Sequence, residues 1–315
     1  MKILFIAPKY SGGIGGHAKR VADKLRADGF EIELMQVPHI PIKKLKNPSF
    51  AIISTFKALC GTKKYDVVHA FNIPSAFAMK STKAKKRVLS VHGVYSEQID
   101  ALHSGITSSK VKNKEGKILG WADKLLTNSK NVKKTYKEKL GLDFEYMYGP
   151  IDIEKLGKIG KTVQKKKQVV YVGRDSHEKG IDVIKKIETR INAKVVYCTD
   201  MKWEQAMNIL KSSKIVLVPS RIDNVPNIIK EAFFLKVPVV ASDILGINEV
   251  ISNGENGVLV ESENSEKFIE AINELLEDDV RAKKITDNAY DFVLKKFTWD
   301  TLFPKYRQFY LDLVE

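Results

Sequence analysis

The chain has 315 residues, a hydrophobic content of 43% and a formal net charge of +15 at pH 7. This length is sufficient for two domains, and the composition is that of a globular protein rather than of a disordered or fibrous one. The two cysteines, Cys60 and Cys198, form neither a disulfide framework nor a metal-binding pattern, so a reducing compartment is expected. No apolar run approaches the roughly 20 residues that span a bilayer, and no signal peptide is visible. We therefore expect a cytoplasmic protein.

The positive charge is confined to the first half of the chain. Residues 1–160 carry 29 Lys and Arg against 14 Asp and Glu, whereas residues 161–315 carry 24 of each. Such a one-sided distribution indicates that the first half meets an anionic partner, and nucleic acid, anionic lipid and a phosphorylated acceptor all fit. The alternative is a lysine-rich surface without a specific partner, and the balanced second half argues against it.

The N-terminal segment predicts a βαβ unit. A strand, a glycine-rich turn, a helix and a second strand follow one another at residues 2–7, 11–16, 17–29 and 31–37. Gly13 and Gly16 would let a phosphate or a sugar approach the backbone at the helix N-terminus. An NAD-dependent dehydrogenase is the competing interpretation. It fits poorly, because the first glycine of the G-x-G-x-x-G pattern would fall on Ser11 and no acidic residue ends the second strand.

Residues 39–64 are basic and partly amphipathic. Within a predicted helix over 49–60, apolar side chains recur at spacings near one helical turn, at Phe50, Ile53, Phe56 and Leu59. We favour the interpretation that this face covers the core of the first domain. The alternative is a patch that binds a membrane surface, because lysines lie on both sides of the helix.

Two further strands of the first half end in polar side chains. They are predicted at 65–72 and 88–91, and open α/β sheets bind ligands at the carboxyl ends of their strands. His69 lies within the first of these strands and is expected to be structural. His92 follows the second strand, beside Gly93, and is a candidate for ligand contact. The polar segment 102–116 is expected to be either a mobile loop over an acceptor site or disordered.

The second half opens with a strand at 168–172, followed by a turn that carries two cations. Arg174 and Lys179 lie between Gly173 and Gly180. Arginine offers a planar fork to two phosphate oxygens, and lysine offers a compact charge. Both suit a pyrophosphate leaving group, on which negative charge grows in the transition state.

Residues 214–243 predict a strand–loop–helix–strand unit of a parallel sheet. The loop after strand 215–218 carries Asp223, and the helix over 227–235 carries Glu231. Both carboxylates fall near the carboxyl edge of the sheet, where a helix N-terminus also favours anions. The alternative is that both are solvated surface charges.

These motifs resemble those of the glycosyltransferase family 4 group, which are retaining enzymes with the GT-B fold. The family usually has Glu, seven residues, and then Glu followed by Ala; here Asp223 stands at the first place and Glu231 at the second. The turn from Gly173 to Gly180 is similar to the family motif G-R-x-x-x-x-K-G. The resemblance covers nearly the whole chain and is strongest over residues 168–261.

The resemblance implies an α/β protein with two Rossmann-like domains that face each other across a cleft. The acceptor-binding domain is expected at 1–152, a linker at 153–167 and the nucleotide-sugar-binding domain at 168–298. The C-terminal helix, 299–315, is expected to cross back onto the first domain.

The resemblance also implies roles for individual residues. His92 contacts the transferred sugar, Arg174 and Lys179 hold the pyrophosphate, and Asp223 faces the sugar. The positions expected to bind the donor are Gly13, Gly16, Gly173, Arg174, Lys179, Asn227, Ile228 and Glu231. Among these, Asn227 and Ile228 contribute backbone amides, and Glu231 holds the ribose hydroxyls.

The implied activity is that of a retaining hexosyltransferase. The donor is a UDP-, GDP- or ADP-linked sugar, and the acceptor is a glycan or a lipid-linked molecule. The chain contains no Asp-x-Asp and no His/Cys cluster, so neither a metal nor a cofactor is expected. The sequence shows no obvious carboxylate placed as a covalent nucleophile. The resemblance implies a front-face route, in which the leaving phosphate helps to deprotonate the acceptor.

Two other functions remain open. One is a GT-B-fold nucleotide-sugar epimerase, which uses water in place of the acceptor. The other is a non-catalytic protein that binds nucleic acid through the basic half. The sequence lacks a basic strand interleaved with aromatic residues and lacks a recognition-helix motif, so we do not expect a nucleic-acid partner.

Overall fold

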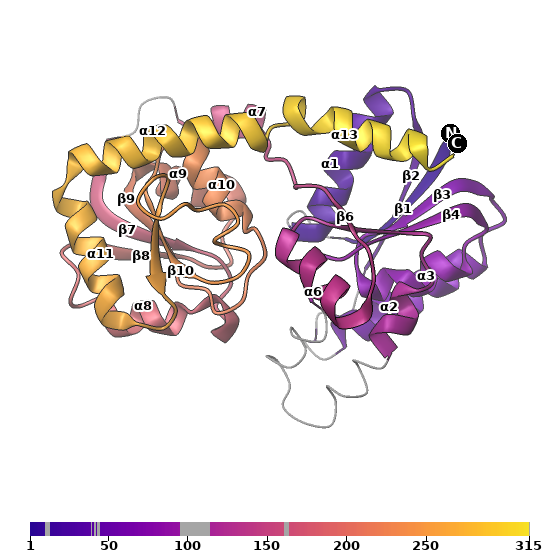
Figure 1. Ribbon diagram of the computed structural model, residues 1–315, viewed down its shortest axis with the longest axis horizontal. Helices are drawn as coiled ribbons and strands as arrows, with labels where there is room; N and C mark the ends of the chain where they lie inside the picture. The colour runs from indigo at the N-terminus through magenta and orange to yellow at the C-terminus, as the bar shows by residue number, and fades with distance from the viewer. Residues whose placement is uncertain are drawn as a thin grey trace. The chain divides into compact units, whose positions relative to one another are not determined.

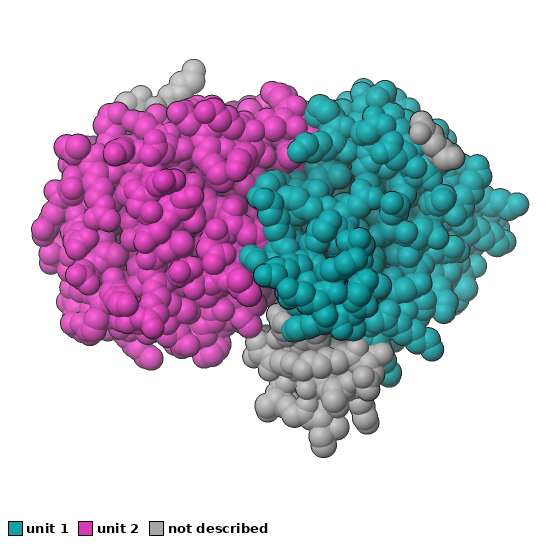
Figure 2. Space-filling view, in the orientation of Figure 1, with its two compact units in different colours: residues 1–149, 303–315 teal, residues 150–302 magenta. Residues whose placement is uncertain are grey.

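The computed structural model describes residues 1–9, 13–38, 40, 42, 45–94, 114–160 and 164–314. The chain forms two compact units (Figure 2). The first unit comprises Met1–Gly149 and Phe303–Glu315, and the second comprises Pro150–Leu302. Each unit is a parallel β-sheet with helices packed on it, which confirms the predicted fold class (Figure 1).

The sheet of the first unit has six parallel strands in the order β2-β1-β3-β4-β5-β6. Their bounds are β1 (Lys2–Pro8), β2 (Glu31–Val37), β3 (Tyr65–Ala70), β4 (Ala84–Ser90), β5 (Lys124–Thr127) and β6 (Glu145–Tyr146). The strand order reverses at β1, which lies between β2 and β3. Open α/β sheets bind ligands outside the carboxyl ends of the strands at such a switch point.

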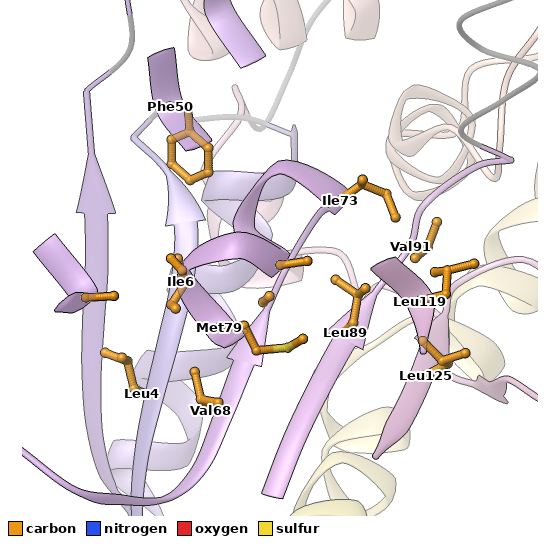
Figure 3. Packing of buried hydrophobic residues seen from close by; sticks show 14 of the residues in the cluster. Leu4, Ile6, Phe50, Val68, Ile73, Met79, Leu89, Val91, Leu119 and Leu125 are labelled. Atoms are coloured by element: carbon orange, nitrogen blue, oxygen red, sulfur yellow. The ribbon is translucent and has the colours of Figure 1, made fainter. Parts of the chain in front are cut away.

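Helices cover both faces of this sheet because parallel strands carry apolar side chains on both sides. The helices are α1 (Gly13–Ala27), α2 (Lys46–Leu59), α3 (Ala76–Ser81), α6 (Lys130–Leu140) and the last part of α13 (Trp299–Asp312). On one face, Phe50 of α2 and Met79 of α3 pack with Leu4, Val68 and Leu89 of the strands (Figure 3).

The C-terminal helix α13 packs on the other face of the same sheet. The hydroxyl of Tyr310 lies 2.6 Å from Nδ1 of His69 in β3. Nε of Arg307 donates to Asp28, which follows α1, over 2.8 Å. The prediction that the chain returns to its N-terminal domain is therefore confirmed.

The sheet of the second unit has five parallel strands in the order β11-β10-β9-β7-β8. Their bounds are β7 (Lys166–Val172), β8 (Lys194–Cys198), β9 (Ser213–Val218), β10 (Val239–Asp243) and β11 (Val258–Glu261). The helices are α8 (Ile181–Ile187), α9 (Trp203–Ser212), α10 (Asn227–Phe234), α11 (Ser265–Glu277) and α12 (Asp279–Lys296). Apolar side chains of α8, α11 and α12 form a core cluster with the strands.

The segment interpreted as a linker, 153–167, contains secondary structure. Asp152 caps a short helix, α7 (Ile153–Gly157), by accepting a hydrogen bond from the amide of Lys155 over 2.9 Å. Leu156 is buried, and β7 already begins at Lys166. A helix of one turn is too short to show an apolar period in the sequence.

Helix α2 covers the sheet, but only partly through the apolar row that the sequence indicated. Of the four periodic side chains, only Phe50 is buried, at 2% exposure, whereas Ile53, Phe56 and Leu59 are 38%, 69% and 66% exposed. The row that faces the sheet is instead Phe50, Ser54 and Ala58, spaced by four residues. The helix therefore covers the core of the first unit, as the favoured interpretation expected, but three of the four periodic side chains lie on its outer side. In the described part of the chain, no helix has the length and apolar character needed to cross a bilayer.

Candidate donor site in the second unit

The carboxyl edge of the second sheet carries a polar loop between β9 and α10. The buried strand β9 ends at Val218, and Pro226 sets the extended backbone that precedes the first residue of α10, Asn227. Pro226, the residue before the helix, makes no side-chain hydrogen bond to the first turn of α10. The backbone amides of Asn227 and Ile228 therefore lie at a helix N-terminus that lacks a side-chain cap, which is a favourable place for an anion.

A short ion pair joins this loop to the turn after β7. Nζ of Lys179, at the end of a 3₁₀ turn (His177–Lys179), lies 2.5 Å from Oδ2 of Asp223. The same carboxylate accepts hydrogen bonds from the Ser220 hydroxyl, over 3.2 Å, and from the amide of Asn224, over 3.0 Å. Only 22% and 13% of the Lys179 and Asp223 side chains are exposed, so water screens the pair weakly.

Two glycines allow these loops to meet backbone to backbone. A Cβ on Gly180 would lie 1.9 Å from the carbonyl oxygen of Pro219, and a Cβ on Gly246 would lie 2.4 Å from that of Asp223. Both residues also have left-handed φ angles, of 68° and 95°. Any side chain at either position would displace the loop that carries Asp223. The family motif from Gly173 to Gly180 included the first of these glycines, but only the structure shows what either glycine does.

We expect Gly180→Ala to destabilise the protein by roughly 3 kcal/mol or more, because the clash with Pro219 adds to the strain of a left-handed residue. Gly254→Ala is the matched control. Gly254 has a similar φ of 77°, but no described atom lies within 4 Å of its Cβ position, so we expect a loss of only about 1 kcal/mol. Urea denaturation measures both values. Equal losses in the two variants would contradict the packing role of Gly180.

Arg221, in the loop after β9, forms hydrogen bonds to the turn after β7 and to the start of α8. Its Nη1 and Nη2 atoms bind the two carboxylate oxygens of Asp182 over 2.7 and 2.8 Å, and its Nε binds Glu263 over 2.8 Å. Its Nη1 also donates to the carbonyl oxygen of His177 over 2.7 Å. These hydrogen bonds lower the pKa of Asp182 to about 2. Sequence analysis missed this clamp because its partners lie on separate segments.

The structure does not place Arg174 in the cluster of Lys179 and Asp223. Its side chain is 73% exposed and forms an ion pair with Glu178 over 3.1 Å. Gly173 precedes it, and the Tyr171 hydroxyl lies 2.8 Å from the position that a Cβ of Gly173 would take. The same hydroxyl donates to the carbonyl oxygen of Arg174 over 2.6 Å. A side chain at Gly173 would therefore displace the Tyr171 hydroxyl from this turn.

Glu231, on α10, is held by a tryptophan that sequence analysis did not identify. Nε1 of Trp203, the first residue of α9, donates to Oε1 of Glu231 over 3.0 Å. Nζ of Lys155 lies 4.1 Å from the centroid of the Trp203 ring and 2.9 Å from a carboxylate oxygen of Glu204. The carboxylate therefore has a defined orientation. The sequence could not have indicated this hydrogen bond, because Trp203 and Glu231 lie 28 positions apart on different helices.

In the first unit, His92 lies just beyond the carboxyl end of β4. Its Nε2 atom is buried and has no hydrogen-bond partner among the described residues. Burial lowers the pKa of His92 to about 4, so the imidazole is neutral at pH 7. A buried polar atom without a partner is uncommon and marks a site where a ligand can bind. His17 of α1, whose ring lies edge-on with its centroid 5.9 Å away, was not predicted as a neighbour.

His69 is structural, as expected. Its Nε2 lies 2.7 Å from the Ser90 hydroxyl, and its ring stacks on Phe71 with centroids 4.1 Å apart. Together with the hydrogen bond to Tyr310, these contacts occupy both ring nitrogens and one ring face. Burial lowers the pKa of His69 to about 3.

The predicted glycine loop and acceptor loop are described only in part. Gly13 begins α1 with a φ of 53°, and Gly16 is buried in the helix, whereas 10–12 lie outside the described residues. Of segment 102–116, only 114–116 are described, and they are helical. Cys60 and Cys198 are free thiols. In the described part of the chain, no group of three or more His, Cys, Asp or Glu side chains is arranged to hold a metal.

Comparison with known proteins agrees with this architecture. Residues 11–155 match the family model described as "Glycosyltransferase Family 4", and residues 153–278 match "Glycosyl transferases group 1". An uncharacterized glycosyltransferase of Methanocaldococcus jannaschii is 24% identical, with 96% of each chain covered. Sucrose-phosphate synthase from Thermosynechococcus elongatus superposes with a TM-score of 0.81 at 16% identity, over 99% of this chain and 98% of that one. HepE from Anabaena, solved in complex with UDP-glucose, gives 0.75 at 16% identity, over 99% and 100%.

Proposed function

The chain belongs to the glycosyltransferase family 4 group, and on that premise we propose that it is a retaining hexosyltransferase. The proposed donor is a UDP-, GDP- or ADP-linked sugar, and the proposed acceptor is a glycan or a lipid-linked molecule. The main support for this proposal is the Lys179–Asp223 ion pair, which joins the turn after β7 to the loop before α10. A fixed cation and the backbone amides at the start of α10 therefore both lie at the carboxyl edge of the second sheet. The complex of the similar protein HepE with UDP-glucose supports a nucleotide-sugar donor.

Lys179 is suited to stabilising the diphosphate that departs. A fixed ammonium group stabilises the transition state most where negative charge develops, and Lys179 is held in place by Asp223 and the surrounding loop. Arg174 is exposed, and we propose that it turns from Glu178 to the pyrophosphate when the donor binds. We also propose that these cations replace a metal in charge neutralisation.

Glu231 is the proposed partner of the ribose hydroxyls, and Trp203 is the residue that positions it. We expect Trp203→Phe to raise the dissociation constant of the donor about fivefold to tenfold, because the ring remains while the hydrogen bond to the carboxylate is lost. Glu204→Gln is the control, because it breaks the ion pair with Lys155 and leaves the Trp203–Glu231 hydrogen bond in place. Titration with the donor measures both variants. Unchanged affinity in Trp203→Phe would contradict this positioning role.

His92 stays a predicted contact of the transferred sugar. Its neutral imidazole, with Nε2 unoccupied among the described residues, can exchange a hydrogen bond with a hydroxyl group without the cost of burying a charge. The proposed location is the cytoplasm, with the first unit in contact with an anionic membrane surface.

Incubation with labelled UDP-, GDP- and ADP-sugars tests the proposal. Glycan acceptors and a lipid extract are supplied in separate reactions, and the anomeric configuration of the product is read by NMR. The proposal predicts transfer that depends on the acceptor and retains the configuration of the donor. Release of nucleotide at the same rate with and without acceptor would favour an epimerase and overturn it.

A further inference from the structure

Helix α2 has apolar side chains on two sides, and only one of these sides is covered. Phe50, Ser54 and Ala58 face the sheet and are at most 6% exposed. The other side presents a row of large apolar side chains at helical spacing, namely Ile52, Ile53, Phe56 and Leu59, between 38% and 69% exposed. The inner side of the helix is thus packed against the core. Its outer side carries a cluster of large apolar side chains, which is rare on the free surface of a monomeric protein.

Three further exposed apolar side chains precede α2. Ile40, Ile42 and Leu45 are 43%, 57% and 45% exposed, and they lie in the segment that connects β2 to α2. Since β2 ends at the carboxyl edge of the sheet, this segment lies at that edge and α2 runs back toward the amino edge. From Ile52 to Leu59 the row extends roughly 10 Å along the helix. We call these seven apolar residues the α2 face.

Lysines gather where α2 ends. Lys57 is exposed in the last turn of the helix. The register of β3 and β4 pairs Tyr65 with Ala84, so the amino ends of both strands lie together. Five exposed lysines belong to these ends, namely Lys63, Lys64, Lys83, Lys85 and Lys86.

Acidic side chains at this edge offset only part of the charge. Glu33 pairs with Lys63 over 2.9 Å, and Asp66 pairs with Lys85 over 2.8 Å. Lys57, Lys64 and Lys83 remain as excess positive charge near the C-terminal end of α2. This local excess belongs to the same half of the chain that carries the whole net charge of +15.

We propose that the α2 face docks on an anionic lipid bilayer, with its apolar side chains among the acyl chains and its lysines at the headgroups. An apolar row bordered by lysines is the pattern of a helix that lies in a membrane interface. Nucleic acid would engage the lysines but leave the apolar row in water. Two copies of this face would bring like charges together. Only a negatively charged apolar surface satisfies both features.

Docking along α2 would bring the carboxyl edge of the first sheet, through Ile40 and Ile42, close to the bilayer. His92 lies at that carboxyl edge. If the proposed function holds, a membrane-docked enzyme would take a lipid-linked acceptor rather than a free glycan. This consequence rests on the proposed function. The docking itself depends on the first unit alone.

Co-sedimentation of the full-length protein with vesicles tests the proposal. The vesicles contain either phosphatidylglycerol or only phosphatidylcholine. We expect at least about tenfold stronger partition into the anionic vesicles, and a loss of about tenfold or more when the salt rises from about 0.05 M to about 0.5 M. Phe56→Ser and Ile52→Ser should each lower the partition into anionic vesicles about tenfold. Val280→Ser, at a site on α12 that is 82% exposed, should leave it unchanged.

Several results would overturn the proposal. One is the absence of binding to anionic vesicles at low salt, and another is binding that Phe56→Ser does not weaken. A concentration-dependent dimer that Phe56→Ser dissociates would assign the face to a second copy of the chain instead. Donor binding, measured on the same variants by thermal shift, is expected to be unchanged. If donor binding is absent in the wild type, the proposed function fails independently of the vesicle result.

Discussion

Lys179→Gln is expected to lower kcat/KM for sugar transfer by about a thousandfold, because it removes a fixed positive charge from the proposed position of the leaving diphosphate. It should also leave the Asp223 carboxylate without its lysine partner. That carboxylate is only 13% exposed, so a further loss of stability of roughly 2 kcal/mol is expected. Initial rates at several donor concentrations, together with urea denaturation, measure the two effects separately.

Two companion variants make this result interpretable. Lys185→Gln removes an exposed lysine of the same unit, whose carboxylate partner Asp175 lies at 3.6 Å, and should change neither quantity appreciably. Asp223→Asn in the Lys179→Gln background removes the unpaired charge and should restore stability but not activity. Recovery of activity in the double variant would show that Lys179 acts only by neutralising Asp223.

The free energy of unfolding is expected to fall by roughly 5 kcal/mol as the pH is lowered from 7.5 to 4.5. Burial lowers the pKa of His92 to about 4 and that of His69 to about 3, whereas a histidine in the unfolded chain titrates near 6.5. Below pH 6.5 the unfolded state therefore binds protons that the folded state does not. The stability is fully present above pH 6.5 and is lost as the pH falls toward the two folded pKa values.

His69→Gln isolates one of the two contributions. The variant is destabilised at pH 7.5, because contacts with Ser90 and Tyr310 are weakened, but its further loss between pH 7.5 and 4.5 should be smaller by roughly 2–3 kcal/mol. His177→Gln, at an exposed histidine of the second unit, is the control and should leave the pH dependence unchanged. If His69→Gln shows the same pH dependence as the wild type, the buried neutral state of His69 is contradicted.

The fold was predictable where long apolar runs alternate with polar loops. The unit formed by β9, α10 and β10 was expected within about two residues of its bounds, because its strands are continuous apolar runs closed by Pro219 and Asp243. Short elements were not predictable. Helix α7 has five residues and β6 has two, and neither is long enough to show a period.

The candidate site was predictable in its residues but not in its contacts. Asp223 and Lys179 were both identified, yet they are separated by 44 positions, and no spacing rule indicates that they form an ion pair. Trp203 and Arg221 act through partners on other segments and carried no signal in the sequence. Arg174 was expected at the centre of the site, but its side chain is exposed and pairs with Glu178.

Helix α2 shows a different limit. The sequence revealed an apolar row but not which of two adjacent rows faces the core, because a helix with apolar residues on both sides fits either orientation. The structure settles this through Phe50, whose row continues to Ser54 and Ala58 rather than to Ile53. The lysines near α2 and its exposed apolar side chains therefore belong to the same outer surface of the first unit.

The most direct test of the donor site is a thermal-unfolding panel with UDP, GDP, ADP and their sugars, run on the wild type and on Glu231→Gln. A nucleotide at 100 times its dissociation constant stabilises the folded state by roughly 2.7 kcal/mol. One nucleotide family is expected to raise Tm by a few degrees in the wild type and by much less in Glu231→Gln. A panel in which no nucleotide shifts Tm, or in which one shifts both proteins equally, would contradict a nucleotide site at Glu231.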